Sequence, residues 1–353
     1  AASKNLTVSG DVTVNGTLDL DRSSSDGNAT FGSLTINSGG TVQAPSHGNL
    51  TLTSESGAGY HAKNNGTFTH NNGTVKITGP TDSHAEIRGF TSSHPLNNLT
   101  LNNATGSSVE TRIFGAIEIE GDLTLTDGHF DTNGQGPLDV VGDVSVASGA
   151  TFDGSSSTIS HGSLTIASGG TYSATSGTTT ITSRTGGTGT YALENNGTFT
   201  HNNGTVAITD SDNVVSMKLG SSLYNLTLSG GTKKIRDNTT INNDLTVTSG
   251  DLYAHSTTLT LTVTGDAIIS NGGSIGSTLA FTSDISFGSL EIASGGTYNA
   301  TSGTTTITTG GTIGGTSDVA FGGEGTFNHN KGTLVLDSVK HRIPKGGTFY
   351  NLK

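Results

Sequence analysis

A ten-residue segment that returns unchanged is the feature that most constrains how this chain can fold. Residues 66–75 read GTFTHNNGTV, and residues 197–206 repeat all ten positions. A looser copy, GTFNHNKGTL, occupies residues 325–334, so the copies are roughly 130 residues apart. Self-similarity at a fixed long period is typical of architectures in which each unit stacks on the next. The chain is therefore expected to be a repeat protein.

A second marker confirms the spacing and sets the phase of the repeats. The tripeptide Gly-Ser-Leu occurs at residues 32–34, 162–164 and 288–290. It divides the chain into internal repeats at approximately residues 1–97, 98–224 and 225–353, and the first is a truncated copy. No linker or shift in composition separates the repeats. We therefore expect one continuous solenoid over residues 1–353.

Glycine-rich turns and alternating apolar residues predict short β-strands. The 353 residues include 53 Gly and only 5 Pro, and 30% are hydrophobic. Apolar and polar residues alternate with a period of two, as at Leu6/Val8 and Leu34/Ile36, which is the pattern of a half-buried strand. The low hydrophobic share predicts a thin core drawn out along an axis. The polar stretches at residues 21–29 and 54–63 are expected to be loops.

Two architectures fit these short strands. The Asn-Gly pairs at residues 72–73 and 203–204 are a signal for antiparallel hairpins. Near-identical segments at long spacing instead favour a solenoid, in which stacked coils place like residues over like. The predicted fold is all-β, an elongated parallel β-solenoid forming a right-handed β-helix. Coils of about 20–24 residues would give about 15 short-stranded coils, and a rod of about 70 Å.

Composition excludes several functions. The net charge is −12 and charged residues make up 12% of the chain, which argues against nucleic-acid binding. No apolar run is long enough for a membrane span. The chain has no cysteine, which excludes disulfides and thiolate metal sites.

Three histidines are the most tempting metal ligands. His70, His201 and His329 occupy the same position in the three copies of the ten-residue segment. Six coils would separate successive copies by about 28 Å, too far for a shared metal ion. We expect each histidine to be stacked or hydrogen-bonded at a coil corner. The asparagines that follow suit left-handed turn positions and ladders of side-chain amides.

Carboxylates are the remaining candidates for chemistry. Glu118 and Glu120 share a strand face by alternation, and Asp19, Asp21 and Asp26 lie in or beside one stretch. β-Helix enzymes that cleave polysaccharides use paired acids or calcium. Neither group recurs as a cluster with a basic residue beside it, so solvated surface explains them better. The sequence predicts no catalytic residue, metal site or cofactor, and therefore no enzyme.

The two ends of the chain carry opposite charge. Residues 1–30 hold four Asp against Lys4 and Arg22, whereas residues 331–353 hold five basic residues against Asp337. A solenoid ends in open strand edges, and oppositely charged open edges predict head-to-tail stacking into a filament. The residues expected at this assembly interface are Asn5, Leu6, Val8, Asp11, Lys345, Phe349, Tyr350, Leu352 and Lys353.

The repeats resemble those of a known class of proteins. The segments GSLTIASGGTY at residues 162–172 and NNGTFTHNNGTV at residues 195–206 resemble coil repeats of secreted microbial β-helix proteins, among them haemagglutinin-type adhesins and autotransporter passenger stalks. The resemblance implies an extracellular structural protein at the cell surface, used as a filament subunit or adhesin stalk. Its expected partners are other copies of the same chain and surface glycans. No functional residue carries over, because the motif is a packing repeat.

Two alternatives stay open at the level of sequence. One is a β-helix, like that of a phage tail spike, that binds or cleaves polysaccharide through acidic residues near Glu118. The other is a surface array stabilised by calcium, whose melting temperature would fall on chelation.

Overall fold

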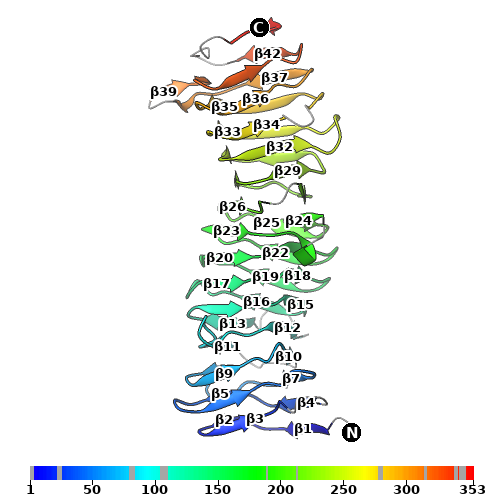
Figure 1. Cartoon of the computed structure of the whole chain (residues 1–353), viewed down its shortest axis with the longest axis vertical. Helices are drawn as coiled ribbons and strands as arrows, with labels where there is room; N and C mark the ends of the chain where they lie inside the picture. The colour runs from blue at the N-terminus through cyan, green and yellow to red at the C-terminus, as the bar shows by residue number, and fades with distance from the viewer. Residues whose placement is uncertain are drawn as a thin grey trace. The chain divides into compact units, whose positions relative to one another are not determined.

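The chain is an all-β parallel β-solenoid of about 12 turns. The computed structural model describes residues 4–21, 26–78, 84–103, 110–187, 190–211, 214–276, 281–313, 316–337, 341 and 347–353 (Figure 1). The one helical segment among them is a short 3-10 turn, η1 (Thr185–Gly187). Two compact units divide the chain: unit 1 comprises Ala1–Thr178 with Asn196–Thr200, and unit 2 comprises Thr179–Asn195 with His201–Lys353.

Unit 1 consists of strands that pair in parallel from turn to turn. Its first ladder contains β1 (Lys4–Val8), β4 (Asp26–Phe31), β7 (Asn49–Leu52), β10 (Thr74–Thr78), β12 (Asn98–Asn102), β15 (Leu123–Asp127), β18 (Val144–Val146) and β21 (Leu164–Ile166). The second contains β2 (Val12–Val14), β5 (Leu34–Ile36), β8 (Tyr60–Asn64), β11 (Ala85–Arg88), β13 (Glu110–Phe114), β16 (His129–Asp131), β19 (Thr151–Asp153), β22 (Thr171–Ser173) and β25 (Thr198–Thr200). The third side is made by β3 (Thr17–Asp19), β6 (Thr41–Gln43) and β9 (Thr67–Thr69), and in later turns by β14 (Ile117–Ile119), β17 (Leu138–Val140) and β20 (Ile159–His161).

Unit 2 is built in the same way. Its first ladder contains β24 (Tyr191–Asn195), β27 (Val215–Lys218), β29 (Thr232–Ile235), β32 (Gly250–Ala254), β34 (Gly273–Ile275), β36 (Thr297–Asn299) and β41 (Thr326–Asn328). The second contains β23 (Thr178–Ile181), β26 (Thr205–Ile208), β28 (Asn225–Leu228), β31 (Leu245–Val247), β33 (Leu261–Ile269), β35 (Ile285–Ile292), β37 (Thr304–Ile307), β42 (Thr333–Leu336) and β43 (Asn351–Leu352), with β30 (Thr239–Ile241) beside β33 and β40 (Phe321–Gly323) beside β35. An antiparallel pair, β38 (Gly311–Ile313) and β39 (Thr316–Val319), completes the unit.

Turn length varies, which corrects two expectations from the sequence. Partner residues on successive strands are 20 positions apart at Val144 and Leu164 but 27 apart at Thr171 and Thr198. The assumption of coils of uniform length therefore gave the wrong number of turns: the structure has about 12 turns, not the expected 15. The expected loops at residues 21–29 and 54–63 also contain parts of β4 and β8. β4 buries only Ala29 and Phe31, and so has no recognisable Leu/Val pair.

The core of unit 1 contains a column of aromatic rings, one from each of four successive turns. Phe130, Phe152, Tyr172 and Phe199 are in register on β16, β19, β22 and β25. Their neighbouring centroids lie 5.6, 4.5 and 5.7 Å apart, and Tyr172 is stacked on both of its neighbours. Parallel in-register strands about 4.8 Å apart impose this spacing on equivalent side chains. Each turn therefore covers the ring of the turn before it.

Asn and Asp side chains connect the turns outside the core. In unit 1 Asn98 Oδ1 accepts the Asp122 N–H (2.8 Å), and Asp122 Oδ1 accepts the Asp143 N–H (2.9 Å). In unit 2 Asn225 Oδ1 accepts the Asp244 N–H (3.1 Å). Side-chain amides also pair directly, as between Asn37 Nδ2 and Asn15 Oδ1 (2.8 Å). Side-chain ladders thus occur, mixed with carboxylates, but at positions other than the expected ones: Asn71, one of the corner asparagines, donates its Nδ2 to the Ala44 backbone carbonyl instead (2.9 Å).

Equivalent motifs do not stack on one another within unit 1. The Gly-Ser-Leu motif at residues 32–34 leads into β5, on the second ladder, whereas the motif at residues 162–164 leads into β21, on the first. The repeat of about 130 residues is therefore not a whole number of turns. The expectation that like residues lie over like was wrong for the long repeat.

Candidate functional site

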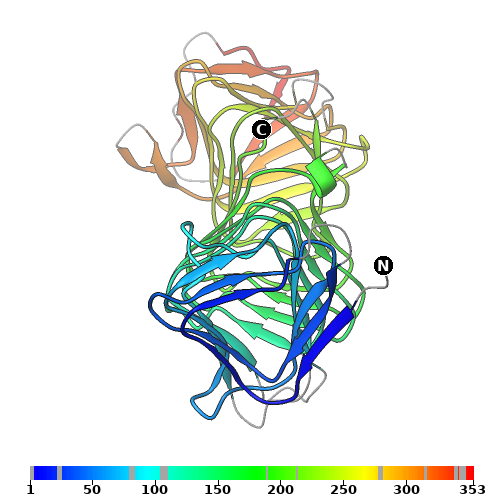
Figure 2. The same ribbon diagram turned by 60° about the horizontal axis from the view of Figure 1, so that its bottom comes forward.

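The first described turn of unit 1 is made by β1, β2 and β3, which stand first in their ladders and pair with the following turn (Figure 2). Leu6 and Val8 of β1 are 40% and 37% exposed, whereas their partners Ala29 and Phe31 in the next turn are 2% and 1% exposed. Leu6 and Val8 are thus partly uncovered, although Val14 of the same turn is buried.

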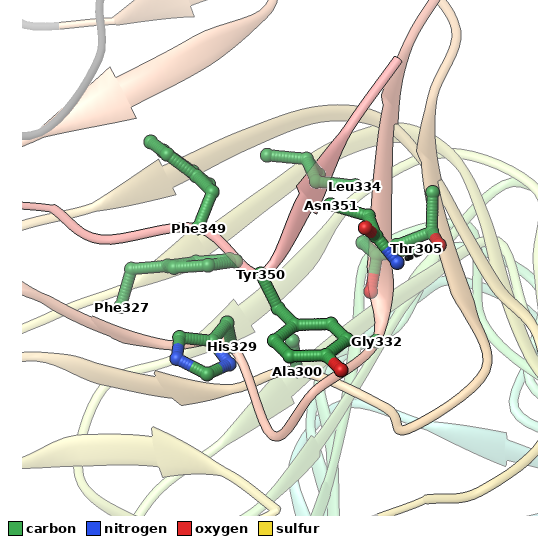
Figure 3. Close-up of a pocket in the computed structure, with 10 residues that line it drawn as sticks. Ala300, Thr305, Phe327, His329, Gly332, Leu334, Phe349, Tyr350 and Asn351 are labelled. Atoms are coloured by element: carbon green, nitrogen blue, oxygen red, sulfur yellow. Dashed lines mark hydrogen bonds between the residues drawn. The ribbon is translucent and has the colours of Figure 1, made fainter.

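The C-terminal turn of unit 2 has the same character. β43 pairs with β42, so that Leu352 lies opposite the buried Leu334. Leu352 is 52% exposed and Tyr350 is 59% exposed. Phe349 instead turns inward, with its ring centroid 5.2 Å from that of Phe327 (Figure 3).

The expected assembly residues therefore form one group at each of two edges. Asn5, Leu6, Val8 and Asp11 lie in the N-terminal turn, and Phe349, Tyr350, Leu352 and Lys353 lie at the C-terminal edge. Lys345 lies outside the described residues. Some of these groups are engaged within the chain: Asn5 Oδ1 accepts the Asn28 N–H (3.0 Å), Asp11 Oδ1 accepts the Ser33 hydroxyl (2.8 Å), and the Lys353 N–H binds the Leu334 carbonyl (2.9 Å).

All three repeated histidines make the same local bond. The Nδ1 atoms of His70, His201 and His329 accept the backbone N–H two residues later, at 3.0, 3.0 and 2.9 Å. The turn that follows each histidine, and donates this N–H, holds two consecutive residues with positive φ, such as Asn202 (46°) and Asn203 (58°). The predicted role as a structural corner residue is confirmed.

A substitution at this corner has a defined cost. Asn203 has a left-handed conformation, which costs a β-branched residue roughly 1–2 kcal/mol. We expect Asn203→Val to lower the free energy of unfolding by about that amount, and Asn203→Gly to leave it nearly unchanged, in urea titrations followed by circular dichroism. Equal values for the two variants would contradict this account of the turn.

The other ring nitrogen is bound by a residue of a later turn. His70 Nε2 lies 3.0 Å from Glu120 Oε2. His201 Nε2 lies 3.1 Å from the side-chain amide of Asn242, and the ring packs on Tyr224 with centroids 5.5 Å apart. His329 stacks on Tyr350 (5.8 Å), but no described residue bonds its Nε2. In the first two copies, therefore, both ring nitrogens have partners among the described residues.

The carboxylates singled out from the sequence lie apart, with Glu118 and Glu120 on and just after β14 and Asp19 at the end of β3. Glu118 lies opposite Asp139 on the next turn, while Glu120 is engaged by His70. Burial raises the pKa of Glu118, and the nearby Asp139 and Glu120 carboxylates raise it further. Asp19 Oδ1 accepts the Asp21 N–H (3.0 Å), a local turn contact.

Within the described residues, no three His, Cys, Asp or Glu side chains are grouped so that they could hold a metal ion. Among those same residues, no helix has the length and apolar character to cross a membrane.

An ionic network on the second ladder of unit 1 was missed from the sequence. Glu110 contacts Arg112 (2.7 Å), His84 (3.4 Å) and His129 (3.5 Å) from three different turns. The Arg88 guanidinium lies 4.1 Å from the centroid of the exposed Phe114 ring. Alternation shows that these side chains point outward, but only the register brings them together.

No protein-family model, curated protein or solved structure matches the chain. The resemblance to adhesin and autotransporter repeats therefore stands at the level of the β-solenoid fold.

Proposed function

We propose that this chain is an extracellular structural protein whose copies stack head to tail, as the subunit of a surface filament or the stalk of an adhesin. The observation that carries the proposal is the parallel solenoid itself, in which the strands of each described turn pair with those of the turns beside it, so that the same pairing can join one copy to the next. Such a role requires no catalytic group. The partner is a second copy of the chain, with surface glycans as further partners of an adhesin.

Physical chemistry supports this pairing of unlike edges. An open parallel strand presents unpaired N–H and C=O groups and accepts another strand readily. Contact between different surfaces of identical copies is heterologous, so it propagates into a filament unless it closes into a ring. The acidic residues of the N-terminal 30 positions and the basic residues of the C-terminal 23 favour this order of docking.

Charge placed on the N-terminal edge provides the test. We expect the double variant Leu6→Lys, Val8→Lys to abolish polymers that the unaltered chain forms in sedimentation velocity and negative-stain electron microscopy, because lysine on an edge strand opposes pairing. The control is Val141→Lys, since Val141 is 59% exposed but lies in the turn after β17. An unaltered chain that stays monomeric at high concentration would refute the proposal.

Polysaccharide binding or cleavage is the second candidate. The observation that favours it is the position of Glu118 directly opposite Asp139 on the next turn, because glycoside cleavage uses a pair of carboxyl groups; burial and the neighbouring carboxylates raise the pKa of Glu118. Incubation with mixed polysaccharides would reveal it as new reducing ends that Glu118→Gln abolishes.

A further inference from the structure

We infer that the outer face of β27, β29 and β32 in unit 2 binds the carboxylate groups of an acidic polysaccharide, through the side chains of Lys234 and Arg236. This inference rests on the part of the proposed function that gives the chain surface glycans as partners, and it names the site and the chemistry of the glycan. It does not depend on how copies of the chain join.

Units 1 and 2 contain the same four-stranded face. β8, β11, β13 and β16 of unit 1 pair in the same register as β24, β27, β29 and β32 of unit 2, and both sets have an irregularity between their first two strands. The corresponding outward positions, with unit 1 first, are Tyr60 and Tyr191, Glu86 and Ser216, Glu110 and Thr232, Arg112 and Lys234, Phe114 and Arg236, and Asp131 and Tyr253. The two faces can therefore be compared residue by residue.

In unit 1 the basic side chains of this face are neutralised within the chain. Arg112 contacts Glu110 (2.7 Å) and Asp131 (3.6 Å), and Arg88 pairs with Glu86. Each guanidinium thus has a carboxylate of the same face beside it. These ion pairs leave little positive charge for an external anion.

In unit 2 the three acidic positions of the face hold Ser216, Thr232 and Tyr253, which carry no charge. The central basic position is kept as Lys234, and Arg236 adds a second basic side chain. Among the described residues no carboxylate forms an ion pair with either of them. The face thus presents two positive charges without an internal counter-charge.

The Arg236 guanidinium is held in place with one nitrogen open. Its Nε donates to Ser216 Oγ (3.1 Å), its Nη1 donates to His255 Nε2 (3.2 Å), and its central carbon lies 5.5 Å from the centroid of the Tyr191 ring. No described residue accepts a hydrogen bond from its Nη2. A planar guanidinium fixed in this way can present two N–H groups to one carboxylate.

A neighbouring histidine reports the positive potential of the face. His255 follows Ala254, the partner of Ile235, so it stands beside Arg236 on the next turn. The charge of Arg236 lowers the pKa of His255, and burial and the charge of Lys234 lower it further. The field that disfavours a proton on this ring favours a bound anion. Like charges on adjacent strands also oppose folding, and an anion bound between them would relieve that repulsion.

The acidic residues around this face have other partners. The Asp237 carboxylate accepts two backbone N–H groups, at 3.2 and 2.7 Å. Asp251 is buried, and its Oδ1 accepts the Ser274 hydroxyl (2.8 Å). Glu194 lies opposite Lys218 on the neighbouring strand. None of the three acids forms an ion pair with the two basic side chains of the face.

Charge density favours a polysaccharide over a nucleic acid as the ligand. Lys234 and Arg236 are two residues apart on one strand, hence about 7 Å apart along it. Double-stranded DNA carries a charge about every 1.7 Å, and the net charge of −12 on this chain would repel such a polyanion. A polymer of uronic acids carries one carboxylate per sugar, and the Tyr191 ring beside Arg236 offers apolar surface to a sugar ring.

Polygalacturonate tests the inference, with its fully methyl-esterified form as the uncharged control. We expect the unaltered chain to bind the first and not the second in isothermal titration calorimetry at about 0.15 M salt, because esterification removes the carboxylate charge. The double variant Lys234→Gln, Arg236→Gln should bind polygalacturonate roughly tenfold more weakly or worse, because both side chains supply charge-assisted hydrogen bonds.

The matched control is the double variant Arg88→Gln, Arg112→Gln in unit 1. It removes the same charge from the face that is already neutralised, so it should bind polygalacturonate as the unaltered chain does. Circular dichroism and urea unfolding establish that each variant is folded. Equal binding by the unit 2 variant and the unaltered chain, or no binding of polygalacturonate at all, would overturn the inference.

A second variant keeps both basic side chains. Thr232→Glu places a carboxylate two residues before Lys234, as Glu110 stands before Arg112 in unit 1. We expect it to neutralise the face in the same way and to weaken binding of polygalacturonate several-fold. Unchanged binding would contradict the account of the unpaired charges.

Further outcomes separate this inference from the proposed function. Binding of dextran sulfate or single-stranded DNA in place of polygalacturonate would overturn the assignment of the ligand. Sedimentation velocity follows assembly independently. Filaments of a chain that does not bind polygalacturonate would overturn this inference alone, whereas binding by a chain that stays monomeric would uphold it and refute head-to-tail assembly.

Discussion

Replacing Tyr172 with Ala is expected to lower the free energy of unfolding of unit 1 by about 3–5 kcal/mol. Tyr172 is fully buried, and its ring lies between Phe152 (4.5 Å) and Phe199 (5.7 Å), so its removal leaves a cavity that the neighbouring turns cannot fill. In a solenoid each turn is stabilised mainly by the turns next to it. Local opening at β19 and β25 should therefore accompany the loss.

The matched control is Tyr172→Phe. It keeps the stacked ring and removes a hydroxyl whose described partner is His161 Nε2 at 3.5 Å, a long contact. We expect it to cost less than about 1 kcal/mol. Urea unfolding gives the free energies, and hydrogen exchange at residues 151–153 and 198–200 localises the effect. If the two variants were equally stable, ring stacking would not hold these turns together.

Acid is expected to destabilise the protein through two buried histidines in unit 1. Burial lowers the pKa of His61 to about 4, opposed in part by the Ser54 carbonyl, and lowers the pKa of His161 to about 4, opposed by Asp143 and the Ser163 backbone. Both side chains are inaccessible to solvent. In the unfolded chain each would titrate near its ordinary value of 6.5.

The sign follows from which state takes up protons. Above pH 6.5 both states are neutral at these rings, and stability does not depend on them. Between pH 6.5 and about 4 the unfolded state binds a proton that the folded state does not. The free energy of unfolding therefore decreases as the pH is lowered, by about 1.4 kcal/mol per pH unit for each histidine. Below about pH 4 the loss is complete.

The measurement is urea unfolding at pH 7.5, 6.0 and 4.5 for the unaltered chain and for His161→Gln. The difference between the two chains isolates this histidine from the carboxylates, which also titrate at low pH. We expect the free energy of unfolding of the variant to depend less steeply on pH, by roughly the contribution of one bound proton. Parallel curves for the two chains would show that His161 keeps its ordinary pKa in the fold.

Much of the local structure could be read from the sequence. Alternating apolar residues located strands such as β1 and β5, and the repeated histidine corner with its left-handed asparagines was anticipated, because both depend on residues close in the chain. Strands with small inward residues, such as β4, were missed because Ala29 gives little hydrophobic signal. The contacts of His70 with Glu120 and of His201 with Asn242 were also missed, since they join residues of different turns.

The amino-acid sequence favoured a parallel solenoid with short strands and polar corners over antiparallel hairpins. Which turn covers which became known from the folded chain, and with it the fact that copies of one motif lie on different faces of unit 1, as β5 and β21 do. The physical reason is that strand and corner formation depend on a few neighbouring residues. The face that a strand occupies depends on the summed length of all the intervening turns.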